Sequence, residues 1–359
     1  MRVLIVVTHL LGTGHLARAL VLGKAFAARG WDVRVASGGR PVPHLDADGV
    51  ALVQLPPLHV VGTDFAQLHG PDGPADAPYM DRRRNALLAT LEPRPDLLIT
   101  ELFPFGRRSL SAEFGALLEA ADGIPTLASI RDILAPPSKP ARADWTAAQV
   151  EAHYDGVLVH SDAELIPLEA SWPVTPALAA RLRYTGFVAP PAPEAGTAGR
   201  GEVLVTAGGG AVGAALFSAA AKAAAADPDR TWRCLTRMAL TGPPNLIVEP
   251  PRPDFRTMLA GAAAVICMCG YNTALDVLQT GARAVFVPFD EGGEVEQGLR
   301  AARMADLPGI EVLRSADLSP GALLAALGRV EGVTRAPRTR GMDGAQRSVD
   351  IVEEMLNAR

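Results

Sequence analysis

The chain has 359 residues, of which 48% are hydrophobic and 20% charged; it is long enough for two globular domains and too apolar for extended disorder. A formal net charge of −5 provides no long-range attraction to nucleic acid or to an anionic membrane surface. No apolar run reaches the length of a membrane span, and the opening run Val3–Val7 is too short for a secretory signal.

The cysteines favour a reducing compartment. Cys234, Cys267 and Cys269 do not form the even-numbered framework of an exported domain, and no second ligand pair stands at a zinc-binding spacing. We therefore expect a cytoplasmic protein with no metal site and no resident cofactor. Nucleic acid is not an expected partner, no basic amphipathic segment supports binding to a membrane surface, and the sequence does not set the oligomeric state.

The first half of the chain alternates between strand and helix patterns. A strand, a glycine turn, a helix and a second strand follow one another, which requires parallel strands. Between Gly49 and Tyr79 the many Pro, Gly and Asp residues predict long loops. The predicted strands are Arg2–Thr8, Val33–Ala36, Pro95–Thr100, Thr126–Ile130 and Gly156–His160, and the predicted helices are His15–Arg29 and Ser109–Ala121.

The pattern restarts after a Pro- and Gly-rich stretch at residues 190–201, which predicts a linker. We therefore predict two Rossmann-like, doubly wound α/β domains facing across a cleft, at residues 1–189 and 202–343. A last helix at residues 344–359 is expected to pack back on the first domain. The second domain's predicted strands are Glu202–Ala207, Thr231–Leu235, Asn245–Glu249, Ala263–Met268 and Ala284–Pro288, with an alanine-rich helix ending at Ala226.

The first candidate site follows the first strand. Thr13, Gly14 and His15 stand where a strand meets a helix, and backbone N–H groups there can hold polar or anionic groups. A third glycine of the dinucleotide fingerprint is missing, so a nicotinamide site is not indicated. A lone histidine is more often a structural residue, but the carboxyl end of a strand is where open α/β sheets bind ligands.

Two more groups follow strands of the same predicted sheet. Glu101 follows one predicted strand, and Arg131 and Asp132 follow the next. His15 is the first candidate general base, since an imidazole suits proton transfer near neutral pH, and Glu101 is the second. Strand carboxyl ends lie near the ligand site of such a sheet. Arg131 and Asp132 are therefore candidates for ligand contact, and an ion pair with a structural role is an equal alternative.

The second domain carries two further candidate segments. Three glycines, Gly208, Gly209 and Gly210, precede a helix without the Lys-Ser/Thr ending of a triphosphate-binding loop, so they predict a diphosphate site rather than hydrolysis. The second segment lies further along the chain. Its candidate residues lie near one expected helix start and in the loop after the next strand, at spacings that suit phosphate, ribose and sugar hydroxyls. They are Gly270, Asn272, Thr273, Asp276, Glu296 and Gln297.

The chain resembles the GT-B glycosyltransferases of the MurG-like type over nearly its whole length, and more narrowly a group of predicted glycosyltransferases. The most specific part lies within Asn245–Met304: the family's Gly-x-x-Thr-x-x-Glu segment is matched by Gly270–Asp276, and its Val-Pro-Phe by Val287–Phe289. The resemblance implies that Asp276 holds the donor ribose and that the pair Glu296 and Gln297, in a loop one residue longer, contacts the donor sugar.

The resemblance also implies that His15 faces the reacting groups from the acceptor domain. The residues on the acceptor side are then Thr13, Gly14, Arg131 and Asp132. It predicts transfer of a sugar, with inversion and without a metal, from a UDP-sugar to an acceptor that the sequence does not identify. Two alternatives stay open: a nucleotide-sugar 2-epimerase, which would rearrange the donor without an acceptor, and a non-catalytic nucleotide-sugar-binding subunit, which would tolerate loss of His15 and Glu101.

Overall fold

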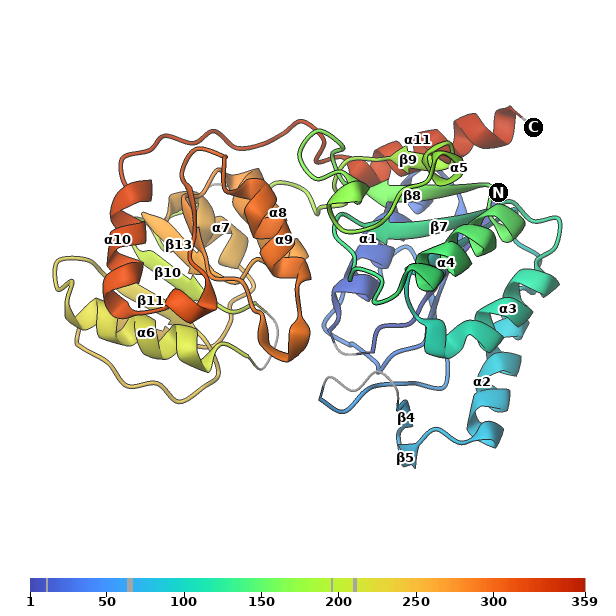
Figure 1. The fold of residues 1–359 in the computed structure, drawn as a ribbon, viewed down its shortest axis with the longest axis horizontal. Helices are drawn as coiled ribbons and strands as arrows, with labels where there is room; N and C mark the ends of the chain where they lie inside the picture. Colours follow the sequence, from blue (N-terminus) through green and yellow to red (C-terminus); the bar gives the residue numbers. More distant parts are fainter. Residues whose placement is uncertain (11, 63–66, 195, 209–211, 359) are drawn as a thin grey trace. The chain divides into compact units, whose positions relative to one another are not determined.

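The computed structural model describes residues 1–10, 12–62, 67–194, 196–208 and 212–358. The chain forms two compact units (Figure 1). Unit 1 comprises Met1–Ala189 together with Asp343–Arg359, and unit 2 comprises Pro190–Met342. The segment predicted as a linker, residues 190–201, clusters with unit 2.

Unit 1 is built on a parallel sheet with the strand order β3-β2-β1-β6-β7-β8-β9 among the described residues. Two strands of two residues each, β4 and β5, form an antiparallel hairpin outside this sheet. The strands are β1 (Arg2–Val7), β2 (Asp32–Ser37), β3 (Ala51–Gln54), β4 (His69–Gly70), β5 (Gly73–Pro74), β6 (Leu97–Glu101), β7 (Thr126–Arg131), β8 (Gly156–His160) and β9 (Leu182–Tyr184).

Helices cover both faces of this sheet, because alternate residues of its strands point to opposite sides. Val3 and Ile5 pack in one cluster with apolar residues of α1 and α11, and Leu4 and Val6 in the other with residues of α2 to α5. The helices are α1 (Gly14–Ala28), α2 (Ala77–Ala89), α3 (Ser111–Ala120), α4 (Pro140–His153), α5 (Pro176–Ala179) and α11 (Gly344–Asn357), with 3-10 turns at Arg108–Leu110 and Leu168–Ala170.

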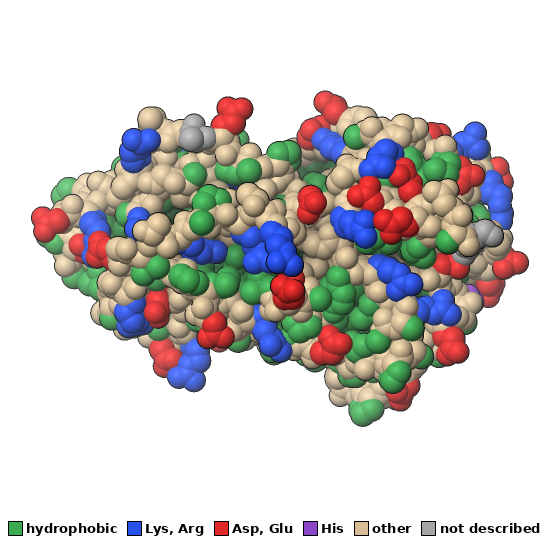
Figure 2. All heavy atoms as spheres, turned by 90° about the horizontal axis from the view of Figure 1, so that it is seen from above, with side chains coloured by type: hydrophobic (Ala, Val, Ile, Leu, Met, Phe, Trp, Pro, Cys, Tyr) green, Lys and Arg blue, Asp and Glu red, His purple; other side chains and the backbone are tan. Residues whose placement is uncertain are grey.

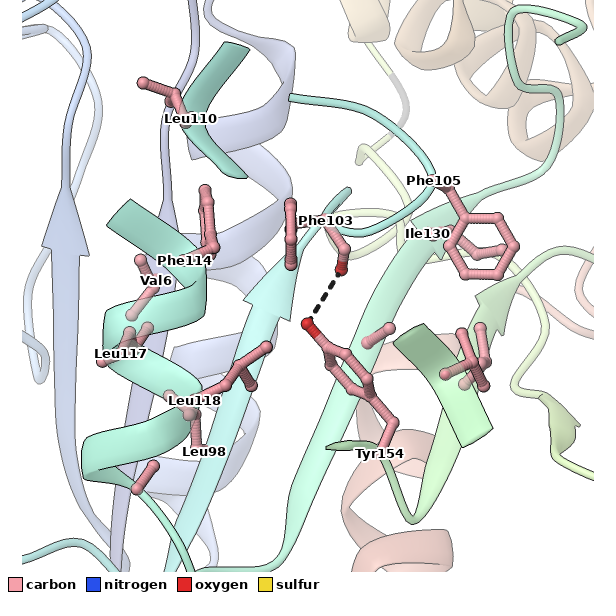
Figure 3. Close-up of a cluster of buried hydrophobic side chains, with 14 of the residues drawn as sticks. Val6, Leu98, Phe103, Phe105, Leu110, Phe114, Leu117, Leu118, Ile130 and Tyr154 are labelled. Atoms are coloured by element: carbon pink, nitrogen blue, oxygen red, sulfur yellow. Dashed lines mark hydrogen bonds between the residues drawn. The ribbon is translucent and has the colours of Figure 1, made fainter. Parts of the chain in front are cut away.

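Aromatic side chains lie among the aliphatic residues of the cluster that contains Leu4 and Val6 (Figure 3). The rings of Phe103 and Phe114 stack with their centroids 4.4 Å apart. The Tyr154 hydroxyl lies 3.5 Å from the Phe103 carbonyl and 2.9 Å from Thr100 Oγ1. This packing fixes the segment that follows β6, directly beyond Glu101.

Unit 2 repeats the plan with a parallel sheet of order β12-β11-β10-β13-β14-β15. Its apolar cluster joins this sheet to α6 and α10. The elements are β10 (Val203–Thr206), α6 (Ala214–Ala225), β11 (Trp232–Leu235), β12 (Leu246–Glu249), α7 (Phe255–Gly261), β13 (Ala264–Cys267), α8 (Tyr271–Thr280), β14 (Ala284–Phe286), α9 (Glu296–Met304), β15 (Ile310–Val312) and α10 (Pro320–Val330), with 3-10 turns at Glu291–Gly293 and Ser315–Asp317.

In both sheets the order in which the chain adds strands reverses at one point. In unit 1 the chain moves outward from β1 to β2 and β3, then returns to place β6 on the other side of β1. Unit 2 does the same with β13 on the other side of β10. Loops diverge at such a switch point and leave a crevice beyond the strand carboxyl ends. The switch points lie at β1/β6 and at β10/β13.

The prediction of a doubly wound parallel fold is confirmed, and each strand predicted from the sequence is present. The expectation of loops throughout Gly49–Tyr79 is wrong at both ends, where β3 pairs with β2 and α2 starts at Ala77, and at the short β4/β5 hairpin between them. β3 is a short, largely exposed edge strand, so it lacks the apolar run that marks a buried strand.

On the face shown in Figure 2, acidic and basic side chains are interspersed.

Candidate functional site

His15 lies at the switch point of unit 1. Helix α1 begins at Gly14, and its N-cap residue, Thr13, makes no side-chain capping bond. The first turn of α1 therefore presents backbone N–H groups just beyond the carboxyl end of β1. Thr13 and Gly14 thus lie at the helix start that the sequence predicts.

The imidazole of His15 contacts Glu101, the last residue of β6. His15 Nδ1 lies 3.0 Å from Glu101 Oε1, and Arg18, one turn further along α1, forms an ion pair with the same oxygen. A carboxylate can only accept, so Nδ1 carries the proton in the hydrogen bond to Glu101 and Nε2 is left with its lone pair. The contact of 3.2 Å between Arg18 Nη2 and Nδ1 is then not a hydrogen bond.

Burial controls the charge of both partners. It lowers the pKa of His15 to about 3; the hydrogen bond to Glu101 opposes this shift, and nearby guanidinium groups, led by that of Arg107, add to it. Burial raises the pKa of Glu101. Arg18, His15 and Ser129 lower it by more than burial raises it, so the pKa lies well below its ordinary range. The pair is therefore a neutral imidazole beside an ionised carboxylate.

The geometry gives Glu101 a different part from the second base that the sequence suggested. Its side chain is 2% exposed and its oxygens already accept from His15, Arg18 and Ser129. A carboxylate so occupied is a poor proton acceptor for an incoming group, but it orients the ring of His15. Only 15% of the His15 side chain is exposed.

Arg131 and Asp132 follow the neighbouring strand. Arg131 is the last residue of β7, and its positive charge contributes to the lowered pKa of His15, which places it near the imidazole. Asp132 is buried, and its Oδ1 accepts from the backbone N–H of Ile133 at 2.7 Å. Asp132 therefore shapes the turn after β7, whereas the charge of Arg131 acts on His15.

In unit 2 Gly208, in the described part of the glycine loop, lies beside the start of α8 at the β10/β13 switch point. Gly208 follows β10 with a φ of +77°, and a Cβ placed on it would lie 3.7 Å from Thr273 Oγ1. Its N–H donates to Thr206 Oγ1 at 3.1 Å. Gly209 and Gly210 lie outside the described residues. Gly208 therefore adjoins Thr273, and the sequence prediction assigned both residues to the donor site.

Helix α8 begins without a side-chain cap. Gly270 is the N-cap residue and makes no capping bond, so neither Asn272 nor Thr273 serves as the cap that a purely structural interpretation would give them. Asn272 is exposed and Thr273 is half-buried. The N–H groups of Asn272 and Thr273, in the first turn of α8, are thus placed to donate to an anion beside Gly208.

Asp276 stands one turn further into α8 and is held by an arginine. Arg256 Nε, from α7, donates to Asp276 Oδ1 at 2.7 Å. Burial raises the pKa of Asp276 to about 6, and the charge and hydrogen bond of Arg256 oppose that shift. The other nitrogens of Arg256 donate to Gln279 and to the carbonyls of Pro190 and Pro191.

Glu296 and Gln297 are the first residues of α9 rather than part of the preceding loop, which corrects the sequence prediction. Gln297 Oε1 accepts from the Phe289 N–H at 3.2 Å, and the Glu296 N–H donates to Glu294 Oε1 at 2.5 Å. Both side chains are half-buried. The amide of Gln297 thus closes the loop that begins at Phe289.

Sequence reasoning missed three arginines that fix these sites: Arg18, Arg256 and Arg300. Arg300, on α9, is 1% exposed; it donates to the Cys269 carbonyl at 2.9 Å and lies over the Tyr271 ring. It therefore holds the turn that leads into α8. A charged residue on the inward face of a helix, between Ala301 and Leu299, is the signal that could have revealed it.

A cavity of about 220 Å³ opens beside the start of α6 in unit 2. Gly213 and Ala214 of the helix start, Met268 after β13, and Phe289 after β14 are among the lining residues. It therefore lies along the same carboxyl edge of the sheet. Among the described residues, no group of three or more His, Cys, Asp or Glu side chains is placed to hold a metal, and none of the helices has the length and hydropathy needed to span a bilayer.

The sequence of this chain is similar to that of known transferases. Residues 240–354 match the glycosyltransferase family 28 C-terminal domain. A UDP-N-acetylglucosamine–N-acetylmuramyl-(pentapeptide) pyrophosphoryl-undecaprenol N-acetylglucosamine transferase of Brucella melitensis biotype 2 is 28% identical over 96% of this chain and 92% of its own. The same-named protein of Brucella suis biovar 1 is 31% identical over 31% of this chain and 32% of its own.

Solved structures share the fold over the whole chain. MurG of Acinetobacter baumannii matches with a TM-score of 0.60 and 17% identity, covering 99% of both chains. A calicheamicin glycosyltransferase matches with a TM-score of 0.64 and 18% identity, covering 99% of this chain and 98% of its own. The two parallel sheets described above thus form the two Rossmann-like domains of the GT-B fold.

Proposed function

We propose that this chain, which is similar in sequence to MurG-like glycosyltransferases and has the GT-B fold, transfers a sugar from a UDP-sugar to an acceptor hydroxyl, with inversion and without a metal. The observation that best supports this reaction is the His15–Glu101 pair at the β1/β6 switch point, a neutral imidazole oriented by a buried carboxylate. Such a pair is suited to removing a proton from a nucleophile.

In the proposed reaction the acceptor oxygen forms a bond to the anomeric carbon of the donor as the bond from that carbon to the diphosphate oxygen breaks. The acceptor's proton goes to His15 Nε2, and the bonding electron pair leaves with the nucleoside diphosphate. Glu101 stabilises the imidazolium as it forms. The N–H groups at the start of α8, beside Gly208, would offset the charge of the departing diphosphate.

The low pKa of His15 describes the protein without substrate. An imidazole with a pKa of about 3 is reliably unprotonated at neutral pH but weakly basic. Binding of an anionic substrate nearby favours the charged form of a histidine and so raises its pKa toward the working pH. His15 would therefore become a stronger base as the substrates assemble.

Asp276 is the proposed ligand of the donor ribose. Its carboxylate would accept from the ribose hydroxyls, in place of part of its contact with Arg256. The uridine base is suggested by the name of the Brucella relative, which includes UDP-N-acetylglucosamine. We test the donor by calorimetry with UDP, dTDP and GDP and their sugars, on wild type and on Asp276→Ala. Saturable binding of one nucleotide that the variant loses supports the proposal, and no binding of any of them refutes it.

The raised pKa of Asp276 predicts that donor binding depends on pH. The carboxylate accepts two hydroxyl hydrogen bonds only when ionised, so affinity falls as pH drops through about 6. We expect UDP-sugar to bind about tenfold more weakly at pH 5 than at pH 8. The titration uses the sugar ester because the terminal phosphate of UDP itself takes up a proton near pH 6. In Asp276→Asn the affinity should be low and independent of pH; a wild-type pH dependence in that variant would contradict the assignment.

Arg300 gives a second prediction for the same site. Replacing it by Met removes its bond to the Cys269 carbonyl and frees the turn before α8, so UDP-sugar affinity should fall about tenfold. Arg303→Met, an exposed position on the same helix, is the matched control and should bind normally. Equal affinities of the two variants by calorimetry would show that the turn does not depend on Arg300.

The two alternative functions predict different products. A 2-epimerase would convert the nucleotide-sugar with no acceptor present, which chromatography of the donor after incubation would detect. A non-catalytic subunit would bind the donor and support its partner equally well after replacement of His15. The His15–Glu101 pair favours an enzyme over the binding subunit, since a binding module has no use for an oriented, unprotonated imidazole.

A further inference from the structure

A line of buried polar side chains continues behind the His15–Glu101 pair. Glu101 Oε2 accepts from Ser129 Oγ at 2.6 Å, Ser129 Oγ lies 2.9 Å from His160 Nε2, and His160 Nδ1 lies 2.9 Å from Thr185 Oγ1. Each of these four residues is at most 3% exposed. The proposed reaction uses only Glu101, which leaves a buried histidine and two hydroxyls without an assigned part.

The line follows the sheet rather than a loop. Glu101 and Ser129 are register partners on β6 and β7. His160 ends β8, and Thr185 follows directly on β9. Since β6, β7, β8 and β9 are adjacent and parallel, four neighbouring segments of the sheet hold these groups in place.

The direction of each hydrogen bond follows from Glu101. As an ionised carboxylate it only accepts, so the Ser129 hydroxyl spends its one proton on Glu101 and must accept from His160 Nε2–H. Burial lowers the pKa of His160 to about 3, so its ring is neutral and Nδ1 accepts from the Thr185 hydroxyl. The Gly186 carbonyl, 2.7 Å from Thr185 Oγ1, would receive that hydroxyl proton only if His160 were charged.

Both halves of the line therefore donate toward Glu101. His15 donates to one carboxylate oxygen and Ser129 to the other, so passing a proton from His15 to Thr185 would require every bond beyond Glu101 to reverse. The arrangement orients a carboxylate; it does not conduct protons.

We propose that Ser129 and His160 are positioning residues that fix the Glu101 carboxylate and, through it, hold His15 as the tautomer with a protonated Nδ1 and a free Nε2 lone pair. This inference rests on the proposed function, in which His15 Nε2 receives the acceptor's proton. Ser129 and His160 act through Glu101 and do not themselves contact the reacting groups.

The test is the tautomer of His15, read from the ¹⁵N chemical shifts of histidine-labelled protein, with the His15 signals assigned by their loss in His15→Gln. Wild type should show a single tautomer with the proton on Nδ1. In Ser129→Ala we expect the ratio of the two His15 tautomers to move about tenfold toward the form protonated on Nε2, the factor carried by one hydrogen bond to a charged group. In His160→Leu, which removes the donor that orients Ser129, we expect a smaller shift in the same direction. An unchanged His15 tautomer in both folded variants overturns the proposal.

Conservative variants separate positioning from packing. His160→Gln keeps an N–H donor for Ser129, and Ser129→Thr keeps the hydroxyl, so both should retain the wild-type tautomer. Ser348→Ala removes another fully buried hydroxyl of unit 1, bonded to the Gly344 carbonyl within α11, and should change nothing. If Ser129→Ala does not fold, Ser129→Cys replaces it and should give an intermediate ratio; a wild-type ratio there overturns the proposal as well.

The tautomer measurement needs no substrate, so it succeeds or fails separately from the donor-binding screen. A shifted tautomer in a protein that binds no nucleotide would support the positioning of His15 and reject the transferase. In a chain that does transfer sugar, Ser129→Ala should lower kcat about tenfold with the donor KM unchanged. The readout distinguishes orientation of the base from loss of the donor site.

Discussion

Replacing His15 by Gln should lower the rate of sugar transfer by about 10²- to 10⁴-fold, the range that a general base contributes. Glutamine fills a similar volume but cannot take up a proton from the acceptor. The structure places His15 in unit 1 and Gly208, Asn272 and Asp276 in unit 2, so donor affinity should stay within about twofold of wild type. The measurement is kcat with the donor identified by the calorimetric screen, alongside the dissociation constant for that donor.

His153→Gln is the matched control, since His153 is an exposed histidine at the end of α4 in the same unit. It should transfer sugar at the wild-type rate. Full activity of His15→Gln would reject the imidazole as the base. Loss of donor affinity in that variant would assign His15 to binding rather than to proton transfer.

Removing Arg83 should lower the free energy of unfolding of unit 1 by about 3–5 kcal/mol, the cost of breaking a buried ion pair. Arg83 Nε and Nη2 donate to the two oxygens of Glu113 at 2.7 and 3.0 Å, and the side chains are 0% and 3% exposed. Arg83 also donates to Thr8 Oγ1 and to the Gly38 carbonyl. In Arg83→Met the carboxylate of Glu113 stays buried without its main partner.

Urea unfolding monitored by tryptophan fluorescence tests this prediction, because Trp31, Trp145 and Trp172 belong to unit 1. Arg84→Met, next along the same helix and 40% exposed in its pair with Asp81, should change stability by less than about 1 kcal/mol. The double variant Arg83→Met/Glu113→Leu should recover much of the loss, since no buried charge is left unpaired. A single variant as stable as the control would show that the pair contributes little.

The same arginine explains why part of the fold could not be read from the sequence. Buried strands such as β1 and β8 are continuous apolar runs and were predicted at their observed positions. Helix α2 was not, because among its 13 residues only Arg83 and Leu87 are buried. Its inward face is set by an ion pair rather than by an apolar stripe, and hydrophobic periodicity carries no signal for that.

The candidate sites show a similar division. Chain order alone placed His15, Glu101, Gly208 and Thr273 beyond strand carboxyl ends, and in the structure the first two meet each other, as do the last two. The arginines that hold Glu101 and Asp276 come from neighbouring helices, at distances along the chain that no motif specifies. Partners of this kind are determined by packing, which one sequence does not display.

The two-part composition of unit 1 has a consequence for how the protein is made. Helix α11 supplies Val349, Ile351 and Val352 to the cluster around α1, and Asp350 and Glu353 pair with Arg29. During synthesis all of Pro190–Met342 emerges before α11 does. Unit 2 can therefore fold first, while the apolar side of α1 is still exposed. Unit 1, whose synthesis begins first, is completed last. Nascent chains stalled before residue 344 should expose that surface to chaperones.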